Sequence, residues 1–226
     1  MKKIAFLSQK GGSGKTTLVV HIAVAAQEDG ERVVIADTDL QRSAGVWSEA
    51  RTNQTPVVAE VAAAQLDSVI EASRHDAMTL CIIDTAPHAA PDAAHVARAA
   101  DLVLIPCRPT AFDLAAAGSA VDIARAAQAR AAFILSACPL RAPEIVEART
   151  VLNTRYGLPV VPVEISERRA FARAIATGRA VTEFDSQGKA AEEIRTLWRW
   201  IKEQMTNGGK KDNWARRIHA KESTTS

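Results

Sequence analysis

A glycine-rich loop with two lysines is the part of this sequence best suited to chemistry. It occupies residues 9–17, reads QKGGSGKTT, and lies between an apolar run and a helical pattern. Glycines let successive backbone N–H groups turn toward an anion, and the amino end of the following helix adds partial positive charge. Lys15 would bring a full charge near the β- and γ-phosphates of a nucleotide, and the Thr16 hydroxyl could bind Mg²⁺. The predicted nucleotide-binding residues of this loop are Lys10, Gly11, Gly12, Ser13, Gly14, Lys15, Thr16 and Thr17.

Carboxylates follow two further apolar runs. Asp37 and Asp39 end one of them, and Asp84 ends the run LCII at residues 80–83. A carboxylate at the end of a buried strand can support Mg²⁺ or cap a helix, and the phosphate loop favours the first interpretation for Asp84. Asp37 can equally be interpreted as a residue that holds the loop in shape. Phosphoryl transfer depends mostly on positioning and charge neutralisation, which these lysines and carboxylates can provide.

The elements that must position these residues alternate between strands and helices. The apolar runs contain many β-branched residues and show no polar alternation, as is typical of strands covered on both faces. Strands are expected at 3–8, 32–37, 57–59, 79–84, 102–107, 132–137 and 159–163. Helices are expected at 15–28, 65–74, 92–100, 113–127, 143–156, 167–177 and 189–205. This order predicts a doubly wound, mostly parallel α/β sheet with helices on both faces.

Composition narrows the class of protein further. The chain has 226 residues, 47% of them hydrophobic and 24% charged, as in ordinary soluble globular chains. No apolar run reaches the roughly 18–20 residues of a membrane span. The three cysteines are far apart and lie in apolar runs, which predicts buried free thiols and a cytoplasmic protein without a metal cluster.

The charge is distributed unevenly. The net charge is +2, but residues 207–226 carry +3 and residues 1–206 carry −1. This argues against a protein that coats DNA with its whole surface. We expect residues 1–206 to form a single domain and residues 207–226 to form a flexible polar and basic tail.

The pattern KGGSGKTT at residues 10–17 resembles the deviant Walker A box of the ParA/MinD superfamily of ATPases. The resemblance implies ATP and Mg²⁺ as cofactors, a P-loop ATPase fold and slow hydrolysis stimulated by a partner. In that superfamily the first lysine reaches the nucleotide of a second chain, so Lys10 would act across an ATP-dependent homodimer. By the same resemblance Lys10, Lys15 and Asp39 would be catalytic.

Other stretches match the same family in order. Residues 37–41 resemble its second box, with Leu40 where proline is usual, and residues 81–87 resemble a Walker B strand. Thr16, Asp39 and Asp84 would then form the Mg²⁺ site. Residues 106–109 resemble the Pro-x-x-Pro element of the small ParF-like plasmid type. Pro106 and Pro109 would border the nucleotide or the dimer face, or alternatively form a rigid turn.

A cluster of arginines suggests a nucleic-acid partner. Non-specific DNA binding needs basic residues on one face, or such residues are simply solvated. The candidates are Arg168, Arg169, Arg173 and Arg179. The family implies a nucleoid-associated plasmid or chromosome partition ATPase that acts with a small centromere-binding, ParB-like protein and without a membrane.

Two alternatives to this interpretation differ from it in function. The first is a ParA-like ATPase that positions a protein cargo or a secretion or T-DNA complex. The second is a metabolic P-loop enzyme such as dethiobiotin synthetase, which Lys10 argues against. Because the first expected strand begins at residue 3, we expect no N-terminal DNA-binding domain.

Overall fold

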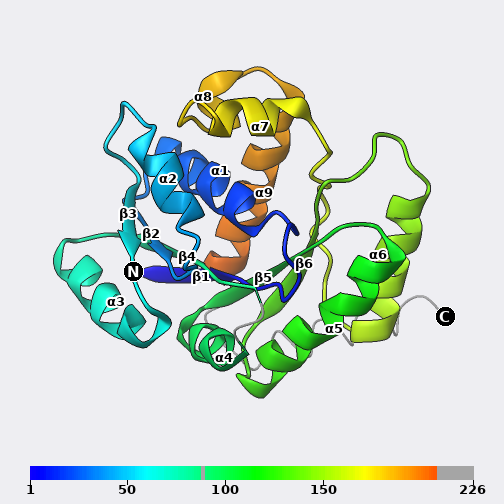
Figure 1. The fold of residues 1–226 in the computed structure, drawn as a ribbon. Helices are drawn as coiled ribbons and strands as arrows, with labels where there is room; N and C mark the ends of the chain where they lie inside the picture. Colours follow the sequence, from blue (N-terminus) through cyan, green and yellow to red (C-terminus); the bar gives the residue numbers. More distant parts are fainter. Residues whose placement is uncertain (88–89, 208–226) are drawn as a thin grey trace.

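A six-stranded parallel sheet runs through the centre of the molecule (Figure 1). The structure is a computed structural model that describes residues 1–87 and 90–207. The strands are β1 (Lys2–Phe6), β2 (Val33–Asp37), β3 (Val57–Glu60), β4 (Leu80–Asp84), β5 (Leu102–Cys107) and β6 (Ala131–Leu135). Their order is β3-β2-β4-β1-β5-β6, and every pairing of these strands is parallel. The predicted α/β architecture is therefore confirmed.

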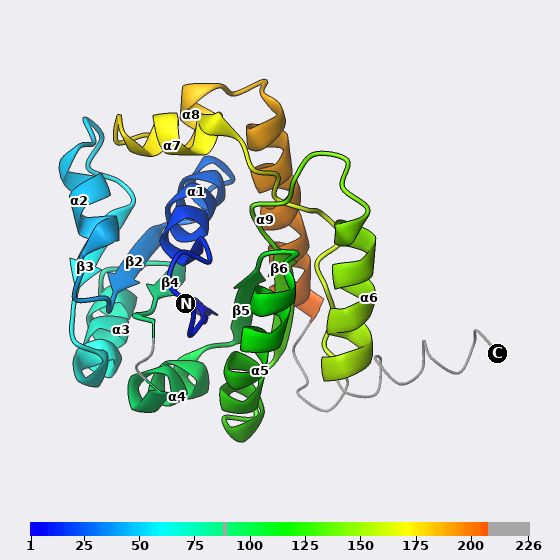
Figure 2. The same cartoon turned by 45° about the vertical axis from the view of Figure 1, so that its right-hand side comes forward.

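Helices cover both faces of the sheet (Figure 2). One face carries α1 (Lys15–Glu28), α2 (Ser43–Glu49), α7 (Arg169–Ile175), α8 (Val181–Phe184) and α9 (Lys189–Asn207). The other carries the short helix η1 (Ala63–Gln65), α3 (Leu66–His75), α4 (Ala90–Ala99), α5 (Ala111–Ala126) and α6 (Glu144–Tyr156). Successive strand residues serve opposite faces: Ile4 and Phe6 pack with α1, whereas Ala5 packs on the other side. The strands are apolar throughout because each face has its own core.

The expected elements agree with the structure except at three places. Residues 159–163 do not form a strand. They lie beside β6 and form only an isolated bridge from Val160 to Phe133. Pro159 and Pro162 have no N–H group to donate, so a continuous ladder cannot form. The short helices α2 and α8 were not expected, because neither carries a helical apolar stripe long enough to detect.

The last helix packs on the sheet along its apolar side. Ile194, Leu197, Trp198 and Ile201 are all buried against the core next to α1. Within residues 1–87 and 90–207, no helix is long and apolar enough to cross a membrane. The expected tail lies outside the described residues from position 208 onward. Cys81, Cys107 and Cys138 are buried free thiols, as predicted.

A buried histidine joins the helix after the glycine-rich loop to the top of the molecule. His21 on α1 is fully buried and stacks against Phe171 of α7, with 5.1 Å between the ring centroids. Its Nδ1 accepts the backbone N–H of Val181 at 3.1 Å. Burial lowers the pKa of His21 from 6.5 to about 3. The imidazole is therefore neutral in the folded protein at neutral pH.

This histidine makes stability sensitive to acid. Below pH 6.5 the unfolded chain binds a proton at His21 that the folded chain refuses until about pH 3, so stability is lost as pH falls through that window. We expect this group to cost about 2 kcal/mol of unfolding free energy between pH 7 and pH 5. Urea denaturation gives the unfolding free energy of the native protein and of His21→Gln at pH 7 and pH 5. The contribution of His21 is the difference between the two proteins in how much stability they lose between these pH values. An identical pH dependence for both proteins would contradict this prediction.

Candidate functional site

The glycine-rich loop leaves β1 at the carboxyl edge of the sheet, where polar groups gather. Gly12 and Gly14 have φ of 71° and 89°, which side chains on other residues rarely allow. Lys15 begins α1, is buried, and its Nζ donates to the Ser8 carbonyl at 3.3 Å. Burial lowers the pKa of Lys15, and the charges of Asp84 and Asp39 oppose this shift. The loop therefore holds a largely desolvated cation beside two carboxylates.

Asp84, the predicted Walker B carboxylate, lies beside the loop. Phe6 of β1, Asp84 of β4 and Asp37 of β2 are level in the sheet, so the strand ends bring them together. The Thr16 hydroxyl donates to Asp84 Oδ2 at 2.5 Å. Asp84 is fully buried, and its Oδ1 has no hydrogen-bond partner among the described residues. Burial raises the pKa of Asp84 to about 7.

These groups fit Mg²⁺ held together with a nucleotide. Within the described ranges no group of three or more His, Cys, Asp or Glu side chains could enclose a metal. Mg²⁺ is usually bound by one or two carboxylates with phosphate oxygens and waters, not by a cage of protein groups. The unpartnered Asp84 oxygen and the adjacent Thr16 hydroxyl supply ligands of this type. Asp39 is half-buried near Lys15 and could support that shell.

Asp37 shapes the loop that carries Asp39. It is buried and accepts the backbone N–H groups of Asp39 at 3.1 Å, Ala44 at 3.0 Å and Gly45 at 3.4 Å. These bonds close the turn after β2 and fix the start of α2. The geometry therefore favours the interpretation of Asp37 as a residue that holds the loop.

Lys10 lies at the mouth of the loop and is bound within its own chain. Its Nζ donates to Asp113 Oδ2 at 2.7 Å, and its side chain stays 41% exposed. Asp113 is also bound by Thr110, whose hydroxyl accepts the Asp113 N–H and caps α5. Hydrogen bonds and charge from Lys10 lower the pKa of Asp113 against the opposing effect of burial, so this carboxylate is ionised at neutral pH. Sequence reasoning missed Asp113, although a threonine three residues before it is a typical helix-capping pattern.

The Pro-x-x-Pro element contributes through Arg108, one of the two residues between its prolines. Pro106 lies inside β5 beside Ile134, and both Pro106 and Pro109 are buried. Arg108 is exposed at the surface and donates to the carbonyl of Gly12. Two large apolar side chains flank the same edge: Leu40 is 95% exposed and Phe112 is 84% exposed. The role of the prolines at a nucleotide stays a prediction.

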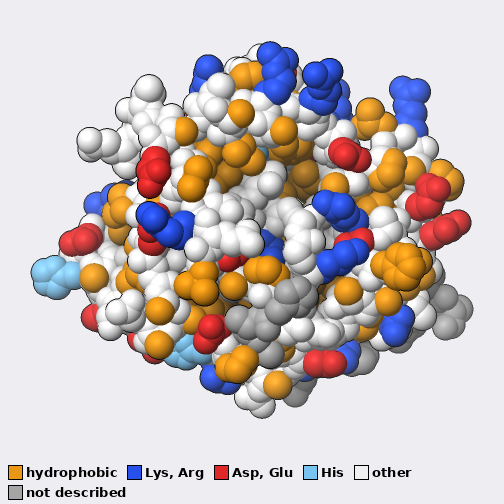
Figure 3. Space-filling view, in the orientation of Figure 1, with side chains coloured by type: hydrophobic (Ala, Val, Ile, Leu, Met, Phe, Trp, Pro, Cys, Tyr) orange, Lys and Arg blue, Asp and Glu red, His pale blue; other side chains and the backbone are white. Residues whose placement is uncertain are grey.

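The predicted DNA-binding arginines do not share one environment. Arg168 is held by Glu193 at 2.8 Å, whereas Arg169, Arg173 and Arg179 are exposed. Arg173 and Arg179 both lie over the Phe184 ring, 5.3 and 5.5 Å from its centroid. Figure 3 shows Lys and Arg side chains gathered along the upper edge, where α7 and α8 lie in Figure 1.

This upper surface is tied to the segment after β2. Buried Arg51 binds Glu183 at 2.8 Å and the Gly178 carbonyl at 2.8 Å. Trp47 of α2 donates to the Arg179 carbonyl at 3.2 Å. A Cβ on Gly178 would come within 2.3 Å of the Ala50 carbonyl oxygen, so these backbones touch.

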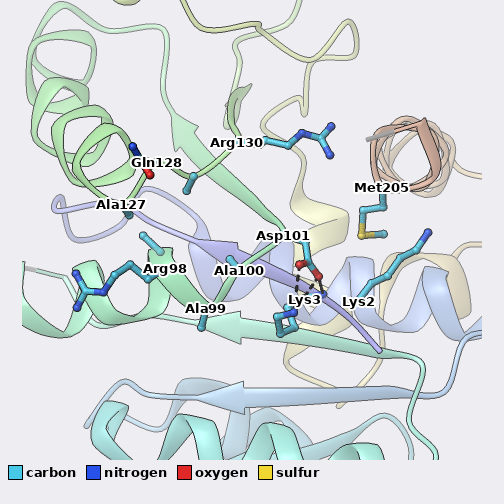
Figure 4. A pocket seen from close by; sticks show the side chains of 12 residues that line it. Lys2, Lys3, Arg98, Ala99, Ala100, Asp101, Ala127, Gln128, Arg130 and Met205 are labelled. Carbon is cyan, nitrogen blue, oxygen red and sulfur yellow. Dashed lines mark hydrogen bonds and ion pairs between the residues drawn. The ribbon is translucent and has the colours of Figure 1, made fainter. Parts of the chain in front are cut away.

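A separate hollow of about 340 Å³ lies at the opposite, amino edge of the sheet (Figure 4). It is lined by Lys2, Lys3, Arg98, Asp101 and Met205 among others, and Lys3 binds Asp101 at 3.1 Å. That ion pair joins the start of β1 to the residue before β5. None of the predicted phosphate-loop or carboxylate residues lines this hollow.

The fold and the loop together define a P-loop nucleotide-binding domain of the ATPase type. Residues 4–181 match the family described as the CobQ/CobB/MinD/ParA nucleotide binding domain, and the chain belongs to this family. The resemblance to the ParA/MinD superfamily in the sequence is therefore confirmed.

Known proteins similar to this chain are of several kinds. One is the maintenance of carboxysome distribution protein A of Gloeobacter kilaueensis, 30% identical over 92% of this chain and 95% of that protein. Protein IncC of Escherichia coli is 27% identical, over 91% of this chain and 70% of its own. Among solved structures, the septum site-determining protein MinD of Pyrococcus horikoshii, complexed with Mg-ADP, superposes with a TM-score of 0.71. It is 18% identical, over 88% of this chain and 95% of that one, which shows a common fold.

The Asp37 hydrogen bonds predict a specific cost of mutation. Asp37→Ala leaves three backbone N–H groups without their acceptor, so we expect the unfolding free energy to fall by about 2–3 kcal/mol. Urea denaturation measures the change. Asp67→Ala, which removes a carboxylate that is 73% exposed, is the control and should change stability by less than about 0.5 kcal/mol. Equal losses would contradict a special role for Asp37.

Proposed function

We propose that this chain is an ATPase that binds Mg-ATP in the loop at residues 10–17, dimerises around the nucleotide and holds DNA without sequence preference. In this proposal it serves plasmid or chromosome partition with a small ParB-like protein that stimulates hydrolysis. The observation that carries the proposal is the desolvated Lys15, which lies beside the hydrogen-bonded pair of Thr16 and Asp84. Lys10 lies at the same carboxyl edge of the sheet.

The site residues support phosphoryl transfer in distinct roles. Mg²⁺ would neutralise phosphate charge when bound, with Thr16 and Asp84 as its protein ligands and Asp39 behind them. Lys15 would hold the phosphates from within the chain. Asp39 would orient a water molecule near the terminal phosphate. Because the described residues place no histidine or glutamate beside these groups, slow turnover is expected without a partner.

Lys10 supports dimerisation because of where it lies. Its amine is close to the surface and is bound by a carboxylate that can release it, and the neighbouring Leu40 and Phe112 expose apolar area. A second chain facing this edge would cover that area and would receive Lys10 at its nucleotide. The Lys10–Asp113 ion pair must open for this to happen.

Replacing Lys10 tests this role. Lys10→Ala should stay monomeric with a non-hydrolysable ATP analogue, because the cation that crosses to the second nucleotide is missing, while binding the analogue nearly as well as the native chain. Light scattering after size exclusion gives the oligomeric state, and titration with a fluorescent analogue gives the affinity. Lys202→Ala, which breaks only the exposed pair with Asp29, is the control and should dimerise. A dimer formed by Lys10→Ala would exclude the proposed contact.

Exposed arginines over α7 and α8 support DNA binding. Arg169, Arg173 and Arg179 keep their charges at the surface, whereas Arg168 is already neutralised by Glu193. A dimer would double this set. Three arginines per chain give an electrostatic attraction that is strongly reduced by salt.

The double variant Arg173→Ala, Arg179→Ala measures this surface. We expect its DNA affinity with ATP to fall about tenfold or more at moderate salt, and the slope of log K against log salt to become shallower by about 2 per chain. Fluorescence anisotropy with two unrelated duplexes gives both quantities. Arg74→Ala on the opposite face is the matched control and should bind as the native protein does. An unchanged salt slope would refute the assignment.

A second candidate function is the positioning of a protein cargo or of a secretion or T-DNA complex. It is favoured by the similarity to the carboxysome distribution protein over nearly the whole of both chains. A plasmid-retention assay separates the two candidates. Loss of the plasmid that naturally carries this gene, on introducing Lys10→Ala, supports partition. Unchanged retention favours a protein cargo.

A further inference from the structure

Three successive carbonyls of the phosphate loop each accept a hydrogen bond from outside the loop. The Gly12 carbonyl accepts from the Arg108 guanidinium, and the Ser13 carbonyl accepts from the Ser136 hydroxyl at 3.1 Å. The Gly14 carbonyl accepts the first helical N–H, that of Leu18, at 2.9 Å. A bond like the last one is found at any helix start, but the first two come from residues that follow β5 and β6.

The two side-chain bonds determine where the next N–H groups point. In a trans peptide the C=O and N–H of one unit point in opposite directions. Binding of the Gly12 carbonyl by Arg108 therefore fixes the Ser13 N–H on the opposite side of that peptide, and binding of the Ser13 carbonyl by Ser136 fixes the Gly14 N–H in the same way. Inward N–H groups in succession are what bind the phosphates of a nucleotide.

The two anchors come from the ends of neighbouring strands. Ser136 directly follows β6 and is buried, so its hydroxyl is committed to this carbonyl. Arg108 directly follows β5 and is exposed, yet its guanidinium reaches back to the loop instead of into solvent. A donor with a full charge also polarises the peptide it binds, which strengthens the N–H on the far side.

We propose that Arg108 and Ser136 are positioning residues that set the phosphate loop in its anion-binding shape before the nucleotide arrives. Neither residue touches the nucleotide in this proposal. They act on the peptides after Gly12 and Ser13, and so on the α- and β-phosphates that ADP and ATP share. The inference rests on the proposed function, because it assumes that the loop binds a nucleotide.

The test compares ADP and ATP binding in Arg108→Met and in Ser136→Ala. Each variant should bind both Mg-ADP and Mg-ATP about tenfold more weakly than the native chain, by the same factor for the two nucleotides. Arg108→Lys should recover most of the loss, because an ammonium can still donate to the carbonyl. Thermal unfolding of Arg108→Met without nucleotide should match the native protein, since this side chain is exposed.

The outcomes separate this inference from the proposed function. Native affinity in Arg108→Met overturns it, with Arg74→Met as the control for loss of one surface charge. A loss for ATP with full ADP binding also overturns it, because Arg108 would then act on the terminal phosphate directly. If the native chain binds neither nucleotide, the proposed function fails and the inference fails with it. Should Ser136→Ala not fold, the Arg108 variants alone decide.

Discussion

Both faces of the parallel sheet are covered, and this constraint governs the rest of the molecule. A strand buried on two sides can carry no charged group along its length, so polar side chains are confined to the strand ends. The chain leaves β1, β2, β4, β5 and β6 at one common edge. Groups that lie more than a hundred residues apart in the sequence, such as Lys10 and Asp113, therefore meet within hydrogen-bond distance. The candidate site therefore lies at the carboxyl edge of the sheet. Because the strands are parallel and covered on both faces, this is the edge where five strands lead into polar loops.

The charges at this edge nearly cancel, and a small excess of negative charge remains. Lys10, Lys15 and Arg108 face four carboxylates, those of Asp37, Asp39, Asp84 and Asp113. Burial raises the pKa of Asp84, which shows how poorly this carboxylate is solvated without a cation beside it. A nucleotide alone would add negative charge to an edge that already carries a small excess of it. A divalent cation would reduce this repulsion, and the Asp84 oxygen without a partner is a ligand suited to Mg²⁺.

The sequence was sufficient for the order of the elements but not for their contacts. Unbroken apolar runs identified β1, β2, β4, β5 and β6, because burial on both faces leaves a strong local signal, whereas the edge strand β3 is only partly buried. The run at 159–163 failed because two prolines prevent a ladder, and α2 and α8 are too short to show a helical period. The loop at 10–17 was evident because its chemistry lies within consecutive residues. Arg108, Asp113 and Ser136 were missed because their partners lie from 96 to 123 positions away in the chain. A distance of that kind is set by topology, which a pattern of neighbouring residues does not contain.

The contact between Gly178 and Ala50 makes the position of the exposed arginines depend on the segment after α2. Arg179 follows a glycine whose backbone rests on the segment after α2, and Trp47 and Arg51 bind the adjoining carbonyls. That segment is joined through α2 to the turn held by Asp37. The exposed arginines above α7 and α8 are thus supported by a segment whose position depends on contacts beside the carboxylates of the site. A change in the seating of α2 would alter the spacing of the arginines without any of them being touched.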